Sequence, residues 1–241
     1  MARDYMAGEV LYIDKPLGWT SFDVVNKIRY MLRAVMGIKK IKVGHAGTLD
    51  PLATGVVIVC TGRATKRIDE FMNHDKEYLA TIRLGQTTPS FDLETPVDAE
   101  YPTEHITRQM VQDVLSRDFT GEVEQVPPMF SAIRIDGKRA YQLARKGNTD
   151  IEMKSRRVTI HRIELEHYDL PVMRLRIRCS KGTYIRSLAR DLGRALHSGA
   201  HLTALERTAV GNISKDMALT LDQLQEQFTR EANTKEQLNK P

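Results

Sequence analysis

Asp50 stands at the edge of what the sequence predicts to be the core. It lies in K-V-G-H-A-G-T-L-D-P-L-A-T-G, residues 42–55, directly before the apolar run V-V-I-V-C. The glycines of this loop allow backbone conformations closed to other residues, while Pro51 fixes the direction of the chain at Asp50. A carboxylate beside a dry core needs a cation or several N–H donors, and an ionised carboxylate can act as a nucleophile. The same residues would also suit an ordinary Asp-Pro turn.

Motifs for other chemistries are missing. No two glycines are spaced G-x-G, and the sequence contains neither a G-x-x-x-x-G-K-[ST] phosphate loop nor a G-x-S-x-G elbow. His197 and His201 have helical spacing, but Gly199 lies between them and no H-E-x-x-H glutamate accompanies them. We therefore expect chemistry from ordinary side chains, with no cofactor and no metal.

Charge is distributed unevenly along the chain. The 36 Lys and Arg against 31 Asp and Glu give a net charge of +5. Residues 131–190 hold 15 basic and 6 acidic side chains, whereas residues 94–126 hold 2 basic and 8 acidic ones. This asymmetry favours a face for a polyanion, although two ordinary solvated faces would give the same counts.

Two cysteines, Cys60 and Cys179, lie far apart in strand-like apolar runs, which argues against a disulfide framework and favours a reducing compartment. The N-terminus lacks the apolar core of a signal peptide, and no run is long enough to span a membrane. We expect a cytoplasmic protein that does not bind membranes.

Hydrophobic periodicity predicts a mixture of strands and helices without regular βαβ alternation. Strands are expected at 9–13, 56–60, 76–84, 156–168, 172–180 and 203–210. Helices are expected at 21–34, 63–74, 104–117, 138–146 and 184–196, with loops at 42–55 and 85–103. The pattern indicates an α+β fold with a mixed, largely antiparallel sheet flanked by helices and loops. We expect one catalytic domain over residues 1–215 and a helical tail over 216–241.

Five segments of the chain, taken in order within residues 9–210, are similar to motifs of the TruB family of tRNA pseudouridine synthases. They read L-Y-I-D-K-P-L-G-W-T-S, G-H-A-G-T-L-D-P-L-A-T-G, K-E-Y-L-A-T-I-R-L-G, P-P-M-F-S-A-I-R-I-D-G-K-R-A-Y-Q-L-A-R-K-G and C-S-K-G-T-Y-I-R-S-L-A-R-D-L-G. The resemblance implies a pseudouridine-synthase-like fold and an isomerase that converts uridine to pseudouridine at position 55 in the T-arm loop of tRNA.

The resemblance also implies roles for single residues. Asp50 would be the catalytic nucleophile, Tyr78 would stack on the target base, and Arg186 would pair with Asp50. The residues around the flipped nucleotide would be His45, Tyr184 and Leu205.

Physical chemistry is compatible with these roles. An ionised Asp50 could attack the sugar C1′, add to C6 of the base or deprotonate the sugar, and the sequence does not choose among these routes. Extracting a stacked base costs a few kcal/mol, and stacking on an aromatic ring returns about 1–3 kcal/mol. Tyr78 could supply this ring, although its strand pattern also suits core packing.

Other residues near the proposed site are expected to have structural rather than chemical roles. Lys15 and Pro16 are expected to support the catalytic loop, and Asp92 to be structural or to orient the tyrosine. Arg186, Arg190 and Arg194 flank the apolar face of the helix at 184–196. We expect Arg190 and Arg194 to form a solvated basic stripe.

The segment 131–157 is rich in basic residues interleaved with Phe130 and Tyr141, which suits an RNA backbone. Its expected RNA-binding residues are Arg134, Lys138, Arg139, Arg145, Lys146, Lys154, Arg156 and Arg157. Many family members continue into a PUA-type RNA-binding domain, for which the tail at 216–241 is too short. The expected partner is the T-arm stem-loop of tRNA, with no required protein partner. A synthase acting on another RNA, and a non-catalytic RNA-binding or RNA-folding module, remain alternatives.

Overall fold

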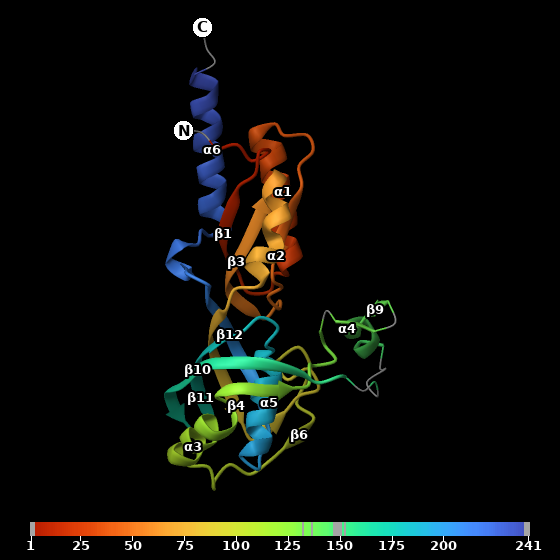
Figure 1. Cartoon of the computed structure of the whole chain (residues 1–241), viewed down its shortest axis with the longest axis vertical. Helices are drawn as coiled ribbons and strands as arrows, with labels where there is room; N and C mark the ends of the chain where they lie inside the picture. The colour runs from red at the N-terminus through yellow and green to blue at the C-terminus, as the bar shows by residue number, and fades with distance from the viewer. Residues whose placement is uncertain (1–2, 132, 136, 147–150, 152, 239–241) are drawn as a thin grey trace. The chain divides into compact units, whose positions relative to one another are not determined.

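The computed structural model of the chain (Figure 1) divides into two compact units. Unit 1 combines Met1–Lys76 with Glu206–Pro241, and unit 2 is the continuous segment Glu77–Leu205. The structure describes residues 3–131, 133–135, 137–146, 151 and 153–238. Two strands contain the crossings between the units: β4 (Lys76–Leu84) on the outward path and β12 (Ala200–Val210) on the return.

Unit 1 is built around β3 (Ala53–Thr61). This strand pairs antiparallel with β1 (Val10–Lys15) and with β2 (Val43–Ala46). It also neighbours β12, which makes a short hairpin with β13 (Ile213–Ser214). The helices of unit 1 are α1 (Ser21–Met36), α2 (Ile68–Met72) and α6 (Leu221–Leu238), with 3-10 turns η1 (Gly62–Arg67) and η2 (Lys215–Met217).

The start and end of α1 follow from local sequence. Thr20 accepts a hydrogen bond from the Asp23 amide, and the Asp23 carboxylate accepts one from the Thr20 amide, which makes a capping box. Gly37 ends the helix in the left-handed conformation with φ of 65°. Between these caps, the apolar face of α1 is buried, and the helix contacts α6.

Unit 2 is built around a sheet in the order β12, β4, β11 (Val172–Cys179), β10 (Arg156–Asp169) and β7 (Gly121–Gln125). Both β11 and β7 run antiparallel to β10. Its helices are α3 (Arg108–Asp118), α4 (Ala140–Ala144) and α5 (Ile185–Ala195). Two small ribbons pair β5 (Gln86–Thr87) with β6 (Ala99–Glu100) and β8 (Arg134–Ile135) with β9 (Lys138–Arg139).

The α+β fold class is confirmed, and so is the hairpin predicted at 156–168 and 172–180. Arg174 and Arg178 are exposed on β11, whereas Leu175, Ile177 and Cys179 are buried. Several expectations need correction. The first half of the helix predicted at 63–74 is the 3-10 turn η1. The loops at 42–55 and 85–103 contain the short strands β2, β5 and β6, the basic helix at 138–146 begins as strand β9, and β7 was not predicted. These strands are only two to five residues long, too short for a period to stand out.

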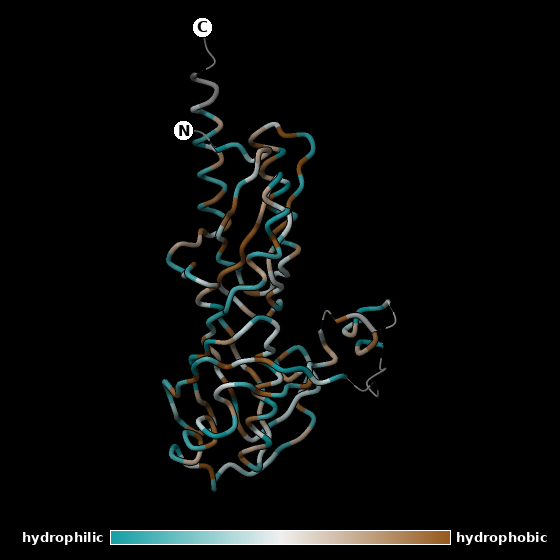
Figure 2. The backbone as a smooth tube through the Cα atoms, in the orientation of Figure 1, coloured by the Kyte–Doolittle hydropathy of each residue, from teal (hydrophilic) through white to brown (hydrophobic). Residues whose placement is uncertain are grey.

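The interior of unit 1 is the apolar run that follows the Asp50 loop. Val56, Val57, Ile58, Val59 and Cys60 are fully buried, and Figure 2 shows β3 as a brown stretch. The loop is therefore attached directly to a strand whose residues 56–60 are fully buried. Within the described part of the chain, no helix combines the length and apolarity needed to cross a membrane.

Candidate active site

The loop that carries Asp50 connects β2 to β3 and is fastened to α1. Ser21, the first residue of α1, accepts a hydrogen bond from the Leu49 amide at 2.8 Å and donates one to the Leu49 carbonyl at 3.2 Å. Both Ser21 and Leu49 are buried. On the other side, the Ala53 amide donates to the Asp50 carbonyl at 3.0 Å. The backbone of Asp50 is thus held on both sides, while the residue itself remains partly exposed.

A buried arginine holds the same loop from β12. Arg207 is 1% exposed and donates to three backbone carbonyls. Its Nε lies 2.7 Å from the Val56 oxygen, and its terminal nitrogens lie 3.4 Å from the Thr48 oxygen and 3.3 Å from the Gly47 oxygen. The guanidinium satisfies its own donors and orders the residues that precede Asp50.

The close approach of β12 also explains why residue 55, at the end of the Asp50 loop, is a glycine. Gly55 has φ of 101°, and a Cβ placed on it would lie 2.2 Å from the Arg207 carbonyl oxygen. Only glycine avoids both the strained backbone and this collision.

A second buried cation, Lys15, holds the loop after Asp50. Lys15 is fully buried, and its Nζ donates to the carbonyls of Trp19 at 2.6 Å, Pro16 at 3.0 Å and Pro51 at 3.4 Å. Burial lowers the pKa of the ammonium to about 8, although the charge of the nearby Asp50 carboxylate raises this pKa. By the same interaction, Lys15 favours the ionised form of Asp50.

His45 lies on β2 opposite Val59 and is partly buried. Burial lowers the pKa of its imidazole below the ordinary value, and the nearby Arg207 adds to this effect. The ring is therefore neutral at pH 7. A neutral imidazole here suits contact with a nucleotide better than an ionic role.

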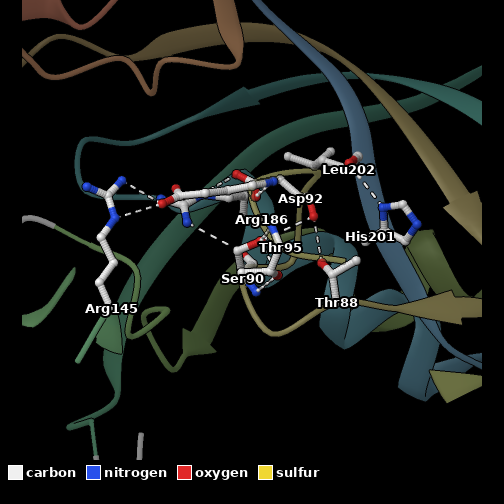
Figure 3. Close-up of polar contacts among 9 residues, drawn as sticks. Thr88, Ser90, Asp92, Thr95, Arg145, Arg186, His201 and Leu202 are labelled. Carbon is white, nitrogen blue, oxygen red and sulfur yellow. Dashed lines mark hydrogen bonds and ion pairs between the residues drawn. The ribbon is translucent and has the colours of Figure 1, made fainter. Parts of the chain in front are cut away.

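Unit 2 places Arg186 in a cluster of polar contacts at the start of α5 (Figure 3). The side chain is 4% exposed, with Nε 3.6 Å from an Asp92 carboxylate oxygen and a terminal nitrogen 3.3 Å from the Ser90 carbonyl. Asp92 is itself held, because its other carboxylate oxygen accepts the Glu94 amide at 2.9 Å. Its backbone carbonyl accepts the Thr88 hydroxyl at 2.7 Å. Arg186 is thus a pre-positioned cation.

Three predicted substrate contacts lie on or next to strands and helices of unit 2. Tyr78 lies on β4 and is 8% exposed. Tyr184 precedes α5. Its backbone N–H donates to the side-chain oxygen of Gln125 at 2.7 Å, and its carbonyl accepts from the side-chain nitrogen of Gln125 at 3.0 Å. The Arg156 guanidinium lies over the Tyr184 ring, 4.5 Å from its centroid. Leu205 lies on β12, partly exposed, two residues before Arg207.

The predicted RNA-binding segment presents most of its cations to solvent. Those exposed are Lys138, Arg139, Arg145, Lys146, Lys154 and Arg157. Arg145 forms an ion pair with Glu94 at 2.6 Å, and Arg157 forms one with Glu122 at 3.1 Å. The side chain of Arg134 and residues 132, 136, 147–150 and 152 of this segment lie outside the described residues.

One expectation about α5 was wrong. Arg194 is exposed, but Arg190 is only 9% exposed. It donates to the Asp191 carboxylate at 2.7 Å and to the Val126 carbonyl at 3.1 Å, and it lies over the Phe91 ring. The helix pattern could not reveal the contacts with Val126 and Phe91, because these residues come from distant segments.

The sequence reasoning also missed two residues of this region. Arg207 was not singled out, although a cation in the strand predicted at 203–210 is the signal that could have found it. Asp92 was expected to be structural or to orient the tyrosine, and its pairing with Arg186 was not foreseen. Among the described residues, no group of three or more His, Cys, Asp or Glu is arranged to hold a metal ion.

Comparison with known proteins shows the family of this chain. The protein-family model described as TruB family pseudouridylate synthase (N terminal domain) matches residues 33–185. The chain belongs to the TruB family. A second model, tRNA pseudouridylate synthase B C-terminal domain, matches residues 186–240.

Relatives within the TruB family cover nearly the whole chain. The tRNA pseudouridine synthase B of Parabacteroides distasonis is 62% identical over 221 residues, which is 92% of this chain and 93% of the relative. That of Flavobacterium johnsoniae is 50% identical over 225 residues, 93% of this chain and 97% of the relative. The TruB-family reaction of this chain is the isomerisation of uridine to pseudouridine in tRNA.

A solved structure with the same fold is the crystal structure of a Cbf5-Nop10-Gar1 complex. It matches with a TM-score of 0.70 and 27% identity, over 95% of this chain and 60% of that chain. The chain therefore spans less than two thirds of that protein.

Proposed function

We propose that this enzyme isomerises the uridine at position 55 in the T-arm loop of tRNA, with Asp50 as the nucleophile. The observation that carries the proposal is the fixed loop around Asp50. Ser21, Lys15 and Arg207 all hold backbone groups of residues 47–51, and Asp50 itself remains partly exposed. Such fixation supports a catalytic group, since a misplacement of about 1 Å can slow a reaction about a hundredfold.

The reaction itself needs no cofactor. The bond between N1 of the base and C1′ of the ribose breaks, the base turns, and a bond forms between C5 and C1′. The proton on C5 leaves and N1 gains one, so atoms and electrons balance. Asp50 can begin this sequence by attack on C1′, by addition to C6 or by removal of a sugar proton, and each route needs the ionised carboxylate that Lys15 favours.

The remaining site residues have roles in the same proposal. Arg186 pairs with Asp50 and offsets the cost of its desolvation in the complex. Tyr78 stacks on the extracted base. The nucleotide is surrounded by His45, Tyr184 and Leu205.

The exposed cations of residues 131–157 bind the RNA backbone. The catalytic domain in this proposal is residues 1–215.

The test combines a substrate comparison with one isosteric substitution. A T-arm stem-loop, whole tRNA and rRNA fragments are incubated with the protein, and pseudouridine is mapped chemically. We expect conversion at the T-arm uridine in the first two RNAs. Asp50→Asn should abolish turnover while RNA affinity changes less than tenfold, about 1.4 kcal/mol. The matched control is Asp69→Asn, an exposed aspartate on α2 of the same unit. Turnover near wild type in Asp50→Asn would exclude the proposed nucleophile, and conversion confined to rRNA would exclude the proposed substrate.

A further inference from the structure

Unit 1 carries a second concentration of positive charge that none of the assigned roles uses. Between Asp23 and Asp50, residues 24–49 contain no Asp or Glu at all. The basic residues of this stretch are Lys27, Arg29, Arg33, Lys39, Lys40 and Lys42. Uninterrupted charge of one sign beside the loop of a nucleic-acid enzyme favours a phosphate backbone as partner.

The exposed face of α1 adds aromatic rings to this charge. Phe22 and Tyr30 are 60% and 65% exposed, although large aromatic side chains are usually buried. With Asn26 and Arg33, they share one face of the helix, opposite the buried face. Exposed rings interleaved with cations are typical of surfaces that bind nucleic acid through stacking and charge together.

The side chains of this face are partly fixed. Arg29 donates to the Asn26 side chain at 2.7 Å and to the Val43 carbonyl on β2 at 3.3 Å, so it ties the face to the strand that leads into the Asp50 loop. The Lys27 ammonium lies 5.9 Å from the centroid of the Tyr30 ring. These contacts keep the cations close to the helix surface.

The charge continues beyond the end of α1. Lys39, Lys40 and Lys42 are all exposed in the segment that returns to β2. The 16 residues of α1 span about 24 Å, and the first of them, Ser21, holds Leu49 next to Asp50. Within one unit, the surface therefore runs from the catalytic loop to a point about 24 Å along the helix.

We propose that this surface, formed by Phe22, Asn26, Tyr30, Arg33, Lys39, Lys40 and Lys42, is a second RNA-binding surface. It binds the phosphate backbone of the substrate tRNA outside the T arm. The inference rests on the proposed function, because it takes the target uridine to lie at Asp50. With that base at the beginning of the surface, RNA that reaches the three lysines belongs to a more distant part of the molecule.

Binding of two RNAs by a pair of charge-reversed variants tests the proposal. The test variant is Lys39→Glu/Lys40→Glu, and the control is Arg3→Glu/Arg230→Glu, two exposed arginines of the same unit outside this surface. Both change the net charge equally. Affinities for whole tRNA and for a T-arm stem-loop are measured over a salt series. An Asp50→Asn background prevents turnover.

For the test variant, we expect whole-tRNA affinity to fall about tenfold or more. The slope of log affinity against log salt should fall by roughly 1.5, since each lost phosphate contact removes about 0.7–0.9. Stem-loop affinity should stay within about twofold, and the control should leave both RNAs within about twofold. An equal loss for both RNAs, no loss for either, or an equal loss in the control would overturn the inference. Failure of wild-type protein to convert the stem-loop would instead count against the proposed function.

Discussion

At the scale of single residues, the candidate site depends on cations that are buried rather than exposed. Lys15 and Arg207 are 0% and 1% exposed, and between them they hold six backbone carbonyls around the Asp50 loop. Burial of a charge costs free energy unless hydrogen bonds compensate it. Here the carbonyls provide that compensation, and in return their own geometry becomes fixed. The two cations are therefore positioning residues for Asp50.

Substitution of Arg207 should reveal this role. Arg207→Met leaves three carbonyls without their donor, so we expect a lower melting temperature, since a hydrogen bond to a charged group contributes about 1.5–3 kcal/mol to stability. The loosened Asp50 loop should also reduce the single-turnover rate about tenfold or more, about 1.4 kcal/mol in the barrier. Arg207→Lys keeps the positive charge but not the planar, multi-donor guanidinium. Relative to Arg207→Met, it should therefore restore more of the melting temperature than of the single-turnover rate. Affinity for tRNA should change less than threefold in both, roughly within 0.7 kcal/mol. Full recovery of rate by Arg207→Lys would contradict the positioning role.

The pH dependence should report Lys15. Its pKa of about 8 means that the ammonium is charged below about pH 8 and neutral above it. Deprotonation weakens its bonds to the carbonyls and removes a charge that favours ionised Asp50. We therefore expect the single-turnover rate of the wild type to fall as the pH rises through about 8.

Lys15→Met is the control for this profile. It should be slower throughout and should lack the fall near pH 8, whereas titration of the RNA itself would affect both proteins alike. Identical profiles in the two proteins would show that Lys15 does not govern the alkaline limb.

At the scale of elements, β12 packs closely against β3 at the end of the Asp50 loop. Arg207 lies on β12, the loop leads into β3, and Gly55 lets the two strands approach. The β12 backbone fills the space that any side chain at position 55 would need.

Gly55→Ala should therefore cost more than backbone strain alone. A positive φ costs about 1–3 kcal/mol for a residue with a Cβ, and the Arg207 carbonyl adds a collision. Gly37→Ala is the matched control, because Gly37 has φ of 65° in the same unit with nothing within 4 Å of its Cβ position. We expect Gly55→Ala to lower the free energy of unfolding, measured with denaturant, by at least about 2 kcal/mol more than the control. Equal losses would mean that the strands can move apart.

Elements with clear periodicity could be predicted from the sequence, whereas the burial of Arg190 and Arg207 could not. The hairpin of β10 and β11 was predictable because arginines alternate with apolar residues along β11. The helix α1 was predictable from Thr20 and its apolar face. Arg190 and Arg207 gave no such signal, because their burial depends on the carbonyls of Val126 and Val56, which are distant in sequence. The identity of Asp50 as a candidate came from its loop and the family motifs.

At the scale of the whole molecule, the proposed site residues are divided between the units. Asp50, His45 and Lys15 belong to unit 1, whereas Tyr78 and Arg186 belong to unit 2. Unit 1 is discontinuous, because the chain leaves it after Lys76 and re-enters it at Glu206. Catalysis by this set of residues requires that both units be folded at the same time.

The path of β12 predicts that the two units unfold together. Its first part neighbours β4 in unit 2, and its last part neighbours β3 and β13 in unit 1, so melting of either unit removes partners from one continuous strand. Trp19 is the single tryptophan of the chain and lies in unit 1, so its fluorescence reports that unit alone, whereas far-ultraviolet circular dichroism reports both. We expect the two signals to give coincident denaturation curves. Gly55→Ala, a change in unit 1, should shift both midpoints equally. A dichroism curve with a second transition that Trp19 does not follow, or a shift confined to the fluorescence, would show that unit 2 unfolds independently.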